Sequence, residues 1–428
     1  MSRFSMGVYL ESAIWRCLFY IAYPLRKHFS LRIQAFLERP LRPASLDALA
    51  TQRVGYKSCV LFYCSSAGEY EQALPVLHRL PPSVFGVVIF FSVSGTRYLQ
   101  NRRDTTPHLL APPLDAISVW VPIFEALRPS YTVIVRHELW PGFLYVANQY
   151  GRTVLINASL SEAVRRSFWH KRWKQALLQQ LNLIYTVDDT EKTHFRHTLG
   201  LPEAKISSLI GDTKFDRVFQ RAQATDATEL ENLHTRYIPP HRLTCIVGSA
   251  WEADVDVAME SQSQLIRRKG PSACYLVVVL HEPTEEKLSW VETRAQEKGL
   301  RAVRYSSLEA PAEDSEILLV DQMGILAELY QIGDCALVGG AFHHQVHNVL
   351  EPGCRGLAVA FGPRYENSHE ACKLVRVGLA TVCHTHVDLI RWLQNPDSLQ
   401  QKGKDTRTFL QLQQGTAEKI AKEIMAQI

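Results

Sequence analysis

The chain has 428 residues, of which 46% are hydrophobic and 21% charged, and a formal net charge of +4 at pH 7. This length exceeds what one hydrophobic core usually supports, so we expect two domains. The small net charge gives no reason to expect a nucleic acid as partner. The nine cysteines are scattered without a CxxC pair or a metal-ligand spacing. They favour reduced thiols facing the cytosol over a disulfide scaffold or a metal site.

The first segment of the chain is apolar and aromatic over Met6–Tyr23, and the basic residues Arg26 and Lys27 follow it. Glu11 and Arg16 interrupt it within the roughly 20 residues that a membrane span needs. It also lacks the charge-first order of a secretory signal. We expect a membrane-anchoring helix whose basic flank faces anionic lipid, leaving open whether it spans the bilayer or lies on it. A first helix packed into the protein core is the alternative.

Apolar runs bounded by polar loops follow in the first half of the chain, as buried parallel strands do. The expected strands are Cys59–Cys64, Gly86–Phe91, Leu109–Pro113, Tyr131–Val135, Thr153–Asn157, Leu183–Val187 and Ile206–Ile210. Strand, polar loop and helix alternate at steps typical of βα units. This alternation predicts a doubly wound parallel sheet.

The first of these strands ends in a turn with the sequence Ser-Ser-Ala-Gly-Glu over residues 65–69, and a helix is expected from Tyr70 to Leu80. Glu69 therefore lies at a strand-to-helix turn, where α/β sheets bind ligands. Alternatively, Glu69 only stabilises the helix dipole from the first turn.

A basic and aromatic run covers residues 165–174 and includes Trp173 and Lys174. It predicts either a solvated helix face or a surface for anionic headgroups.

A polar, proline-terminated stretch over residues 216–240 suits a connector between domains. A second α/β series follows it, with strands expected at Thr244–Gly248, Tyr275–Leu280, Arg301–Tyr305, Ile317–Val320, Cys335–Val338 and Leu357–Phe361. Helices are expected over residues 370–377 and from about residue 405.

A glycine turn, Gly339-Gly340, follows one strand of this series, and a helix is expected to begin near His347-Asn348. Glycine lets the backbone approach a ligand closely, and a helix N-terminus offers N–H groups and a positive dipole end to a phosphate. Glu351, one turn into that helix, either accepts hydrogen bonds from sugar hydroxyls or favours the helix dipole.

Two Rossmann-like α/β domains facing one another across a cleft, without a Walker or GxGxxG motif, indicate a GT-B glycosyltransferase. We therefore expect a membrane-associating helix at residues 1–30 and an acceptor-side domain at 31–215. A linker at 216–240 would lead to a nucleotide-sugar-binding domain at 241–428.

Six short motifs occur in one order along nearly the whole chain. They are SSAGE (65–69), HELWP (137–141), INASLSE (156–162), GDTKFD (211–216), DQMGILAELY (321–330) and HNVLEP (347–352). This ordered set resembles the Kdo (3-deoxy-D-manno-octulosonic acid) transferases of lipopolysaccharide assembly.

The resemblance implies an inverting transfer of Kdo from CMP-Kdo to a lipid A precursor, without a metal ion or other cofactor. It also implies a peripheral or monotopic location on the cytoplasmic face of the inner membrane. The nucleotide-sugar, the lipid A precursor and the membrane surface would be the partners, and nucleic acid would not.

The resemblance also assigns roles to single residues. Glu69 would be the general base on the acceptor hydroxyl, Ser66 and Gly68 would shape its loop, and Glu138 would orient the acceptor or support that loop. On the donor side, Lys214 would counter a phosphate or carboxylate and Glu351 would hold the ribose. The remaining donor residues, which would surround the CMP phosphate, are Ser249, Gly339, Gly340 and Asn348.

The chain departs from the family pattern at four presumed ligand loops. Trp251 replaces a histidine, residues 280–284 (LHEPT) lack two arginines, Gln345-Val346 replaces a glycine pair, and Ser159 replaces an arginine. Because guanidinium groups are the best partners of carboxylates, another nucleotide-sugar donor is an open alternative. A non-catalytic relative that binds lipopolysaccharide intermediates is another, and a nucleotide-sugar epimerase of the same fold is a third.

Overall fold

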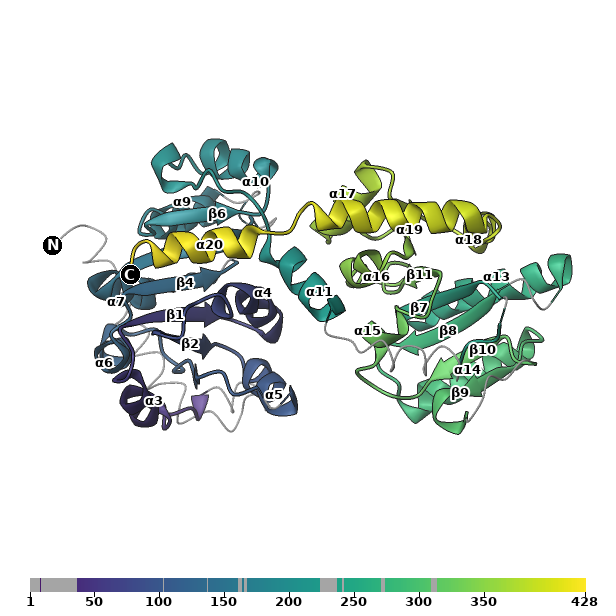
Figure 1. Cartoon of the computed structure of the whole chain (residues 1–428), viewed down its shortest axis with the longest axis horizontal. Helices are drawn as coiled ribbons and strands as arrows, with labels where there is room; N and C mark the ends of the chain where they lie inside the picture. The colour runs from purple at the N-terminus through teal and green to yellow at the C-terminus, as the bar shows by residue number, and fades with distance from the viewer. Residues whose placement is uncertain are drawn as a thin grey trace. The chain divides into compact units, whose positions relative to one another are not determined.

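The computed structural model describes Val8 and residues 37–102, 104–136, 138–160, 164, 168–223, 237–240, 242–270, 274–308 and 314–428. The chain forms two compact units (Figure 1). Unit 1 comprises Met1–Arg217 together with Gln413–Ile428, and unit 2 comprises Val218–Leu412.

Unit 1 is built on a parallel sheet with the strand order β3-β2-β1-β4-β5-β6. This is a doubly wound order, and it reverses direction between β1 and β4, where such sheets bind ligands. The strands are β1 (Ser58–Cys64), β2 (Val84–Phe90), β3 (His108–Leu110), β4 (Tyr131–Val135), β5 (Arg152–Ala158) and β6 (Leu183–Thr186). The strand expected at Ile206–Ile210 is absent from this part of the structure, and Ile206 forms a single isolated bridge with Ile184.

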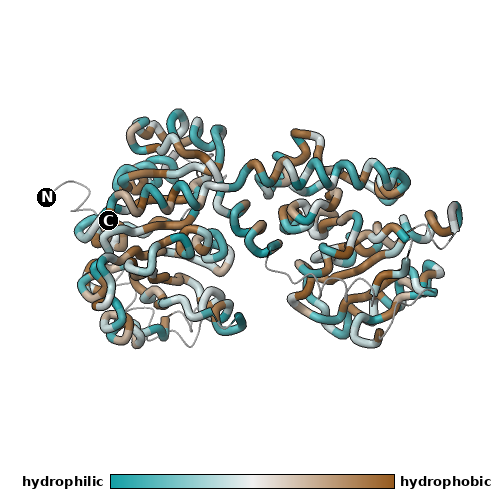
Figure 2. The backbone as a smooth tube through the Cα atoms, in the orientation of Figure 1, coloured by the Kyte–Doolittle hydropathy of each residue, from teal (hydrophilic) through white to brown (hydrophobic). Residues whose placement is uncertain are grey.

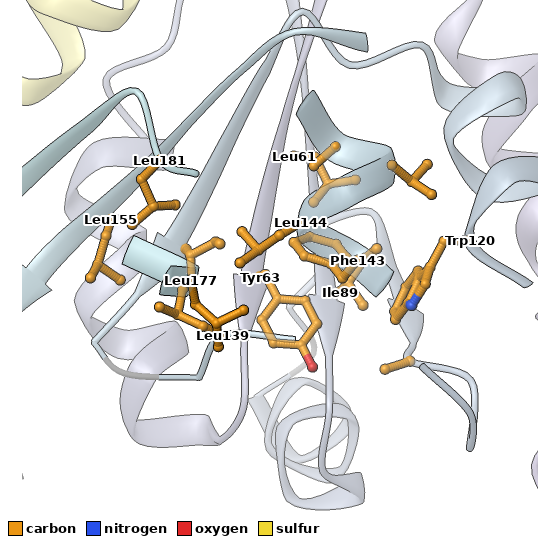
Figure 3. Close-up of a cluster of buried hydrophobic side chains, with 14 of the residues drawn as sticks. Leu61, Tyr63, Ile89, Trp120, Leu139, Phe143, Leu144, Leu155, Leu177 and Leu181 are labelled. Atoms are coloured by element: carbon orange, nitrogen blue, oxygen red, sulfur yellow. The ribbon is translucent and has the colours of Figure 1, made fainter. Parts of the chain in front are cut away.

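The helices of unit 1 cover both faces of its sheet. They are α3 (Leu46–Arg53), α4 (Ala67–Leu77), α5 (Val93–Arg102), α6 (Ile117–Leu127), α7 (Pro141–Tyr150), α9 (Phe168–Leu178), α10 (Asp189–Thr193), α20 (Thr416–Met425) and the start of α11 (Thr213–Gln223). Successive side chains of a strand point to opposite faces, so β1 supplies two cores. Leu61 and Tyr63 pack with Phe143 on one face (Figure 3), and Phe62 packs with Tyr70 on the other.

Unit 2 is built on a second parallel sheet with the order β13-β12-β11-β7-β8-β10-β9. Its strands are β7 (Thr244–Ala250), β8 (Tyr275–Leu280), β9 (Ala302–Arg304), β10 (Ile317–Val320), β11 (Cys335–Val338), β12 (Ala358–Phe361) and β13 (Ala380–Val382). Its helices are α13 (Glu252–Lys269), α14 (Glu285–Glu297), α15 (Leu326–Leu329), α16 (Leu350–Arg355), α17 (His369–Arg376), α18 (His386–Leu393) and α19 (Pro396–Gln411). Hydrophobic residues concentrate on the strands of each sheet (Figure 2).

The end of the chain belongs to unit 1, which differs from the expected second domain at 241–428. Helix α20 buries Ala417, Ile420 and Ile424 in the same core as Phe62 of β1. The Asp216 carboxylate accepts hydrogen bonds from the N–H groups of Gly415 and Ala417 at 2.9 and 3.1 Å. These bonds satisfy the first turn of α20, whose N–H groups have no partner within the helix.

Two expected parts of the chain fall wholly or partly outside the described residues. The membrane-associating helix at 1–30 is represented there only by Val8, and the linker at 216–240 lacks 224–236. The described start of that linker is not a separate segment, because α11 runs through it from Thr213 to Gln223. No helix in the described part of the chain is long and apolar enough to cross a membrane.

Candidate active site

Glu69 lies in the first turn of α4, directly after β1. Ser66 is the N-cap of this helix, and its hydroxyl oxygen accepts a hydrogen bond from the Glu69 N–H at 3.3 Å. The Ser65 N–H donates to the Glu69 carboxylate. Ser66 and Glu69 are therefore held as a compact cap at the carboxyl end of the sheet. A Cβ at Gly68 would lie 3.8 Å from the Ser66 hydroxyl oxygen, so space alone does not require glycine there.

The environment of Glu69 favours the neutral acid. The residue is only 6% exposed, and burial raises the pKa of its carboxyl, while the hydrogen bonds from Ser65 oppose this rise. The negative charge of Glu138 adds to the rise, and the positive charge of Arg136 lowers the pKa. A buried carboxylate with a raised pKa can accept a proton near neutral pH better than an exposed one. This arrangement fits a general base better than a helix-dipole role.

Glu138 lies in the loop between β4 and α7, within electrostatic reach of Glu69. It also acts on Lys174 of α9, which is 9% exposed and whose pKa is lowered to about 8 by burial, a fall that Glu138 opposes. Lys174 is therefore buried within electrostatic reach of Glu138, unlike the exposed Trp173 beside it. His137, the first residue of its motif, lies outside the described residues.

A buried polar network holds α4 in place. The Asn157 amide donates to Gln72 Oε1 at 3.0 Å and to Thr213 Oγ1 at 2.7 Å. Thr213 returns a hydrogen bond from its N–H to Asn157 Oδ1 at 3.1 Å, and its hydroxyl donates to the Gln72 carbonyl at 2.6 Å. Asn157 has a φ of 53°, a conformation that asparagine tolerates better than most residues. Two of the sequence motifs, at 156–162 and 211–216, thus support the helix that carries Glu69.

Asp115 holds the start of α7 in place, as the Asn157 network holds α4. Its carboxylate accepts hydrogen bonds from the N–H groups of Gly142 and Phe143 at 2.7 and 2.8 Å and from the Trp120 indole at 2.7 Å. A Cβ at Gly142 would lie 2.7 Å from the Asp115 carbonyl oxygen, so only glycine permits this approach. The contact positions the loop that contains Glu138.

Lys214 is the second residue of α11, and its N–H donates to Asp212 Oδ1 at 2.8 Å. It lies in unit 1, whereas the other residues expected to bind the donor lie in unit 2.

In unit 2 the glycine turn meets the end of β7. A Cβ at Gly339 would lie 2.5 Å from the Ser249 carbonyl oxygen, and Ser249 itself has a φ of 52°. Gly340 has a φ of 93°, in the region that favours glycine. Ser249 and the glycine turn are therefore brought together, and close backbone packing explains Gly339 while the positive φ explains Gly340.

The N–H groups of this turn are already occupied by Asp254, which is fully buried. Its carboxylate accepts hydrogen bonds from the N–H groups of Gly340 and Trp251, both at 2.8 Å, and of Phe342 at 3.4 Å. Burial raises the pKa of Asp254, and these hydrogen bonds counteract that effect. The Gly340 N–H is therefore engaged within the protein, so any contribution of Gly340 to donor binding comes from the shape of the turn.

Trp251 is the centre of an aromatic and imidazole cluster. Its ring lies 5.1 Å from that of His281 and 5.4 Å from that of His343, with interplanar angles of 27° and 30°. Its indole N–H donates to His347 Nε2 at 3.1 Å, and the His281 and His347 rings stack at 4.5 Å. The Lys287 ammonium lies 4.9 Å from the Trp251 ring centroid. Two of the departures from the family pattern, Trp251 and the segment 280–284, thus meet in one place.

The helix after the glycine turn differs from its expected form. Helix α16 begins at Leu350, has only 6 residues, and follows Asn348, whose side chain accepts a hydrogen bond from the Leu350 N–H at 3.1 Å. Glu351 accepts a hydrogen bond from Arg221 at 3.0 Å. The helix begins two residues after the expected start near Asn348, and the backbone N–H groups of His343 and His344 close a separate turn on the Gly340 carbonyl.

The structure also shows residues that pattern reasoning did not single out. Tyr63, Asp115 and Asp254 act through burial and contacts between distant segments. The sequence alone gives little indication of these roles, because tyrosines in apolar strands and aspartates beside helices are common. His343 could have been noticed as part of a histidine-rich loop that leads to the motif at 347–352.

Comparison with known proteins agrees with this geometry. Residues 37–217 match the family model described as 3-deoxy-D-manno-octulosonic-acid transferase. The 3-deoxy-D-manno-octulosonic acid transferase of Aquifex aeolicus is 27% identical over 309 residues, which cover 72% of this chain and 76% of that protein. The enzyme of the same name from Haemophilus influenzae is 25% identical over 325 residues, covering 74% and 73%.

Solved structures share the fold. A UDP-GlcNAc 2-epimerase from Neisseria meningitidis aligns with a TM-score of 0.59 at 11% identity, covering 86% of this chain and 99% of that one. A glycosyltransferase from Rickettsia africae aligns with a TM-score of 0.58 at 13% identity, covering 86% and 99%. These structures support the two-domain GT-B arrangement of Rossmann-like sheets and nothing more specific. The family model over residues 37–217 and relatives of 21–27% identity support a divergent relationship to the Kdo transferases, and the chain is an enzyme of the glycosyltransferase type.

Proposed function

We propose that the protein transfers Kdo from CMP-Kdo to a lipid A precursor. The observation that carries this proposal is Glu69, a buried carboxyl group with a raised pKa at the carboxyl end of β1. The match of residues 37–217 to the family model supports the same reaction class.

In the proposed reaction the Glu69 carboxylate takes the proton of the acceptor hydroxyl. The hydroxyl oxygen forms a bond to the anomeric carbon of Kdo as the bond from that carbon to the CMP phosphate breaks. CMP leaves with the bonding electron pair, and the single displacement inverts the configuration of the sugar without a metal ion. Ser66 holds the base in place through the helix cap, and Glu138 helps to keep its pKa high.

We assign the donor nucleotide to unit 2, with Ser249, Gly339 and Gly340 shaping the site and Glu351 holding the ribose. The ion pair between Glu351 and Arg221 orients this carboxylate before the donor arrives. Lys214 would counter a donor anion, and Asn348 would help to hold the loop before α16.

A second candidate is a GT-B transferase that uses another nucleotide-sugar. The cluster around Trp251 favours it, because an indole stands where the family carries a histidine, and the neighbouring segment 280–284 lacks two arginines of the family pattern. Titration of the full chain with CMP, UDP and GDP distinguishes the two. Preference for CMP supports the Kdo donor, and preference for UDP or GDP overturns it.

We also propose that residues 1–30 attach the protein to the cytoplasmic face of the inner membrane. The apolar and aromatic run before Arg26 and Lys27 supports this location. Deletion of that segment should abolish sedimentation with anionic vesicles. Equal sedimentation of the truncated and full chains would contradict the anchor.

Transfer itself is tested with purified protein, CMP-Kdo and a lipid A precursor, followed by mass spectrometry of the lipid. A mass increase of one or more Kdo units supports the proposal. Absence of product with the full chain in vesicles, while a Kdo transferase relative gives product under the same conditions, contradicts it.

A further inference from the structure

Unit 1 contains a cavity of about 150 Å³ at the carboxyl ends of β1 and β2. Apolar and aromatic residues form most of its wall, among them Phe91, Ala111, Leu114 and Trp140. The Phe91 and Trp140 rings stack at 5.3 Å with an interplanar angle of 21°. The wall is therefore assembled from separate parts of the chain, at residues 63, 91, 111–115, 120 and 140.

The carboxylate in the wall is already engaged within the protein. The charged residue that lines it is Asp115, whose carboxylate already accepts hydrogen bonds from Trp120, Gly142 and Phe143. The rest of the wall is mostly apolar, and contact with such a wall favours a hydrocarbon ligand, since each buried methylene group contributes about 0.8 kcal/mol. The chemistry of the wall thus selects an apolar ligand.

The cavity adjoins the proposed base. Tyr63, which lines it, is fully buried near the carboxyl end of β1, and Glu69 lies in the first turn of the helix that directly follows this strand. After burial, the charges of Asp115, Glu138 and Glu69 also hold the pKa of the Tyr63 phenol well above the usual range. Figure 3 shows Tyr63 and Trp120 near Phe143, against which both rings pack, at 4.7 and 5.0 Å. A ligand in the cavity would therefore lie close to an acceptor hydroxyl at Glu69.

Two polar groups lie at the wall. The guanidinium of Arg39 donates to the carbonyl oxygens of Phe91 and Ala111, two residues that line the cavity. The buried indole N–H of Trp140 has no acceptor among the residues that the structure describes. A cation and an N–H donor beside an apolar cavity match the carbonyl end of a fatty acyl chain.

We propose that this cavity binds a segment of an acyl chain of the lipid acceptor and so positions the acceptor hydroxyl at Glu69. The proposal rests on the proposed function, since it names the part of the acceptor that unit 1 recognises. A packing defect without a ligand is the alternative outcome.

Binding is tested directly by tryptophan fluorescence, because Trp120 and Trp140 line the cavity. Bromine quenches only nearby indoles, so 11-bromoundecanoic acid should quench the full-length protein saturably and undecanoic acid should not. Ala111→Leu fills the cavity and should weaken this quenching at least about tenfold, since each buried methylene group contributes about 0.8 kcal/mol. Trp251→Phe in unit 2 is the matched control, and it should leave the affinity unchanged.

Equal quenching of Ala111→Leu and wild type would overturn the acyl site, as would the absence of saturable quenching. If Ala111→Leu does not fold, Leu114→Phe serves as a second cavity-filling variant.

A transfer assay separates this proposal from the proposed function. Ala111→Leu should raise KM for an acylated acceptor at least about tenfold, as expected from loss of the same methylene contacts, and leave transfer to a deacylated acceptor unchanged. An equal effect on both acceptors would overturn the acyl site. If wild-type protein transfers Kdo to neither acceptor, the proposed function fails, and the quenching experiment still decides whether the cavity binds acyl chains.

Discussion

The indole N–H of Trp251 donates a hydrogen bond to Nε2 of His347 at 3.1 Å. The acceptor nitrogen must be unprotonated, so the contact requires a neutral imidazole. Burial lowers the pKa of His347, and the neighbouring His281 lowers it further. The hydrogen bond between Trp251 and His347 therefore depends on pH.

We predict that acidification releases Trp251 from His347. The pKa of His347 is lower in the folded than in the unfolded chain, so its stabilising contribution is present above the unfolded pKa. It is lost as pH falls through the folded value, below about 6.5. Trp251 fluorescence should change in that range, and the change should disappear in His347→Phe.

Other titratable groups near Trp251 could also respond to pH, so the prediction needs a control variant. Lys287 lies over Trp251 and pairs with Glu282, while His281, His343 and the buried Asp254 complete the surroundings. His344→Phe changes an exposed neighbour and should retain the transition. Persistence of the full transition in His347→Phe would assign it to another group.

We predict that Glu69→Gln reduces turnover at least about a hundredfold, because general bases contribute about 10²–10⁴-fold. Donor nucleotide affinity should stay within about twofold of wild type, since a group needed only in the transition state changes kcat and not binding. Single-turnover transfer and nucleotide titration measure the two effects. Turnover within a few-fold of wild type would contradict the assignment of the base.

The same variant makes a prediction about stability. Because burial raises the pKa of Glu69, its contribution to stability is present below the unfolded pKa and lost as pH rises through the folded value. Glutamine does not ionise, so Glu69→Gln should melt at or above the wild-type temperature at pH 7. This difference should shrink towards about pH 4. A lower melting temperature at pH 7 would show that the Ser65 hydrogen bond dominates.

We predict that Asn157→Ala loosens α4. The change leaves the buried Thr213 N–H without its acceptor, and such losses typically cost about 1–3 kcal/mol. Hydrogen exchange of the α4 amides should increase. Asn157→Gly is the matched control for the backbone, because glycine tolerates the φ of 53°. Equal protection of α4 in wild type and both variants would contradict the bracing role of Asn157.

We predict that Glu351→Ala weakens nucleotide binding roughly tenfold to a hundredfold, as expected from the loss of charge-assisted hydrogen bonds worth about 1.5–3 kcal/mol. Arg221→Ala should cause a smaller loss, because it removes only the group that orients Glu351. The double variant should bind like Glu351→Ala alone. Additive losses would show that Arg221 contacts the nucleotide independently.

Much of the fold followed from the sequence. Runs such as Tyr131–Val135 are apolar on both faces, a pattern that requires burial on both sides of a parallel sheet. The turn before α4 carries its own cap, so Ser66 and Glu69 could be placed from local chemistry alone. The resemblance to Kdo transferases could be recognised from the order of the motifs along the chain. In the structure these motifs lie at the ends of strands or the starts of helices.

Only the tertiary structure decided three other features. Helix α20 packs in unit 1 because Asp216 caps it from 199 residues away in the chain, a contact that no local pattern encodes. Asp254 occupies the glycine turn from 86 residues away. The pKa values of Tyr63 and Glu69 are raised by burial and by the nearby charge of Glu138, and this neighbourhood exists only once separate strands end at one edge. Local sequence determines which backbone forms, whereas burial and charge proximity depend on segments that meet only in the folded protein.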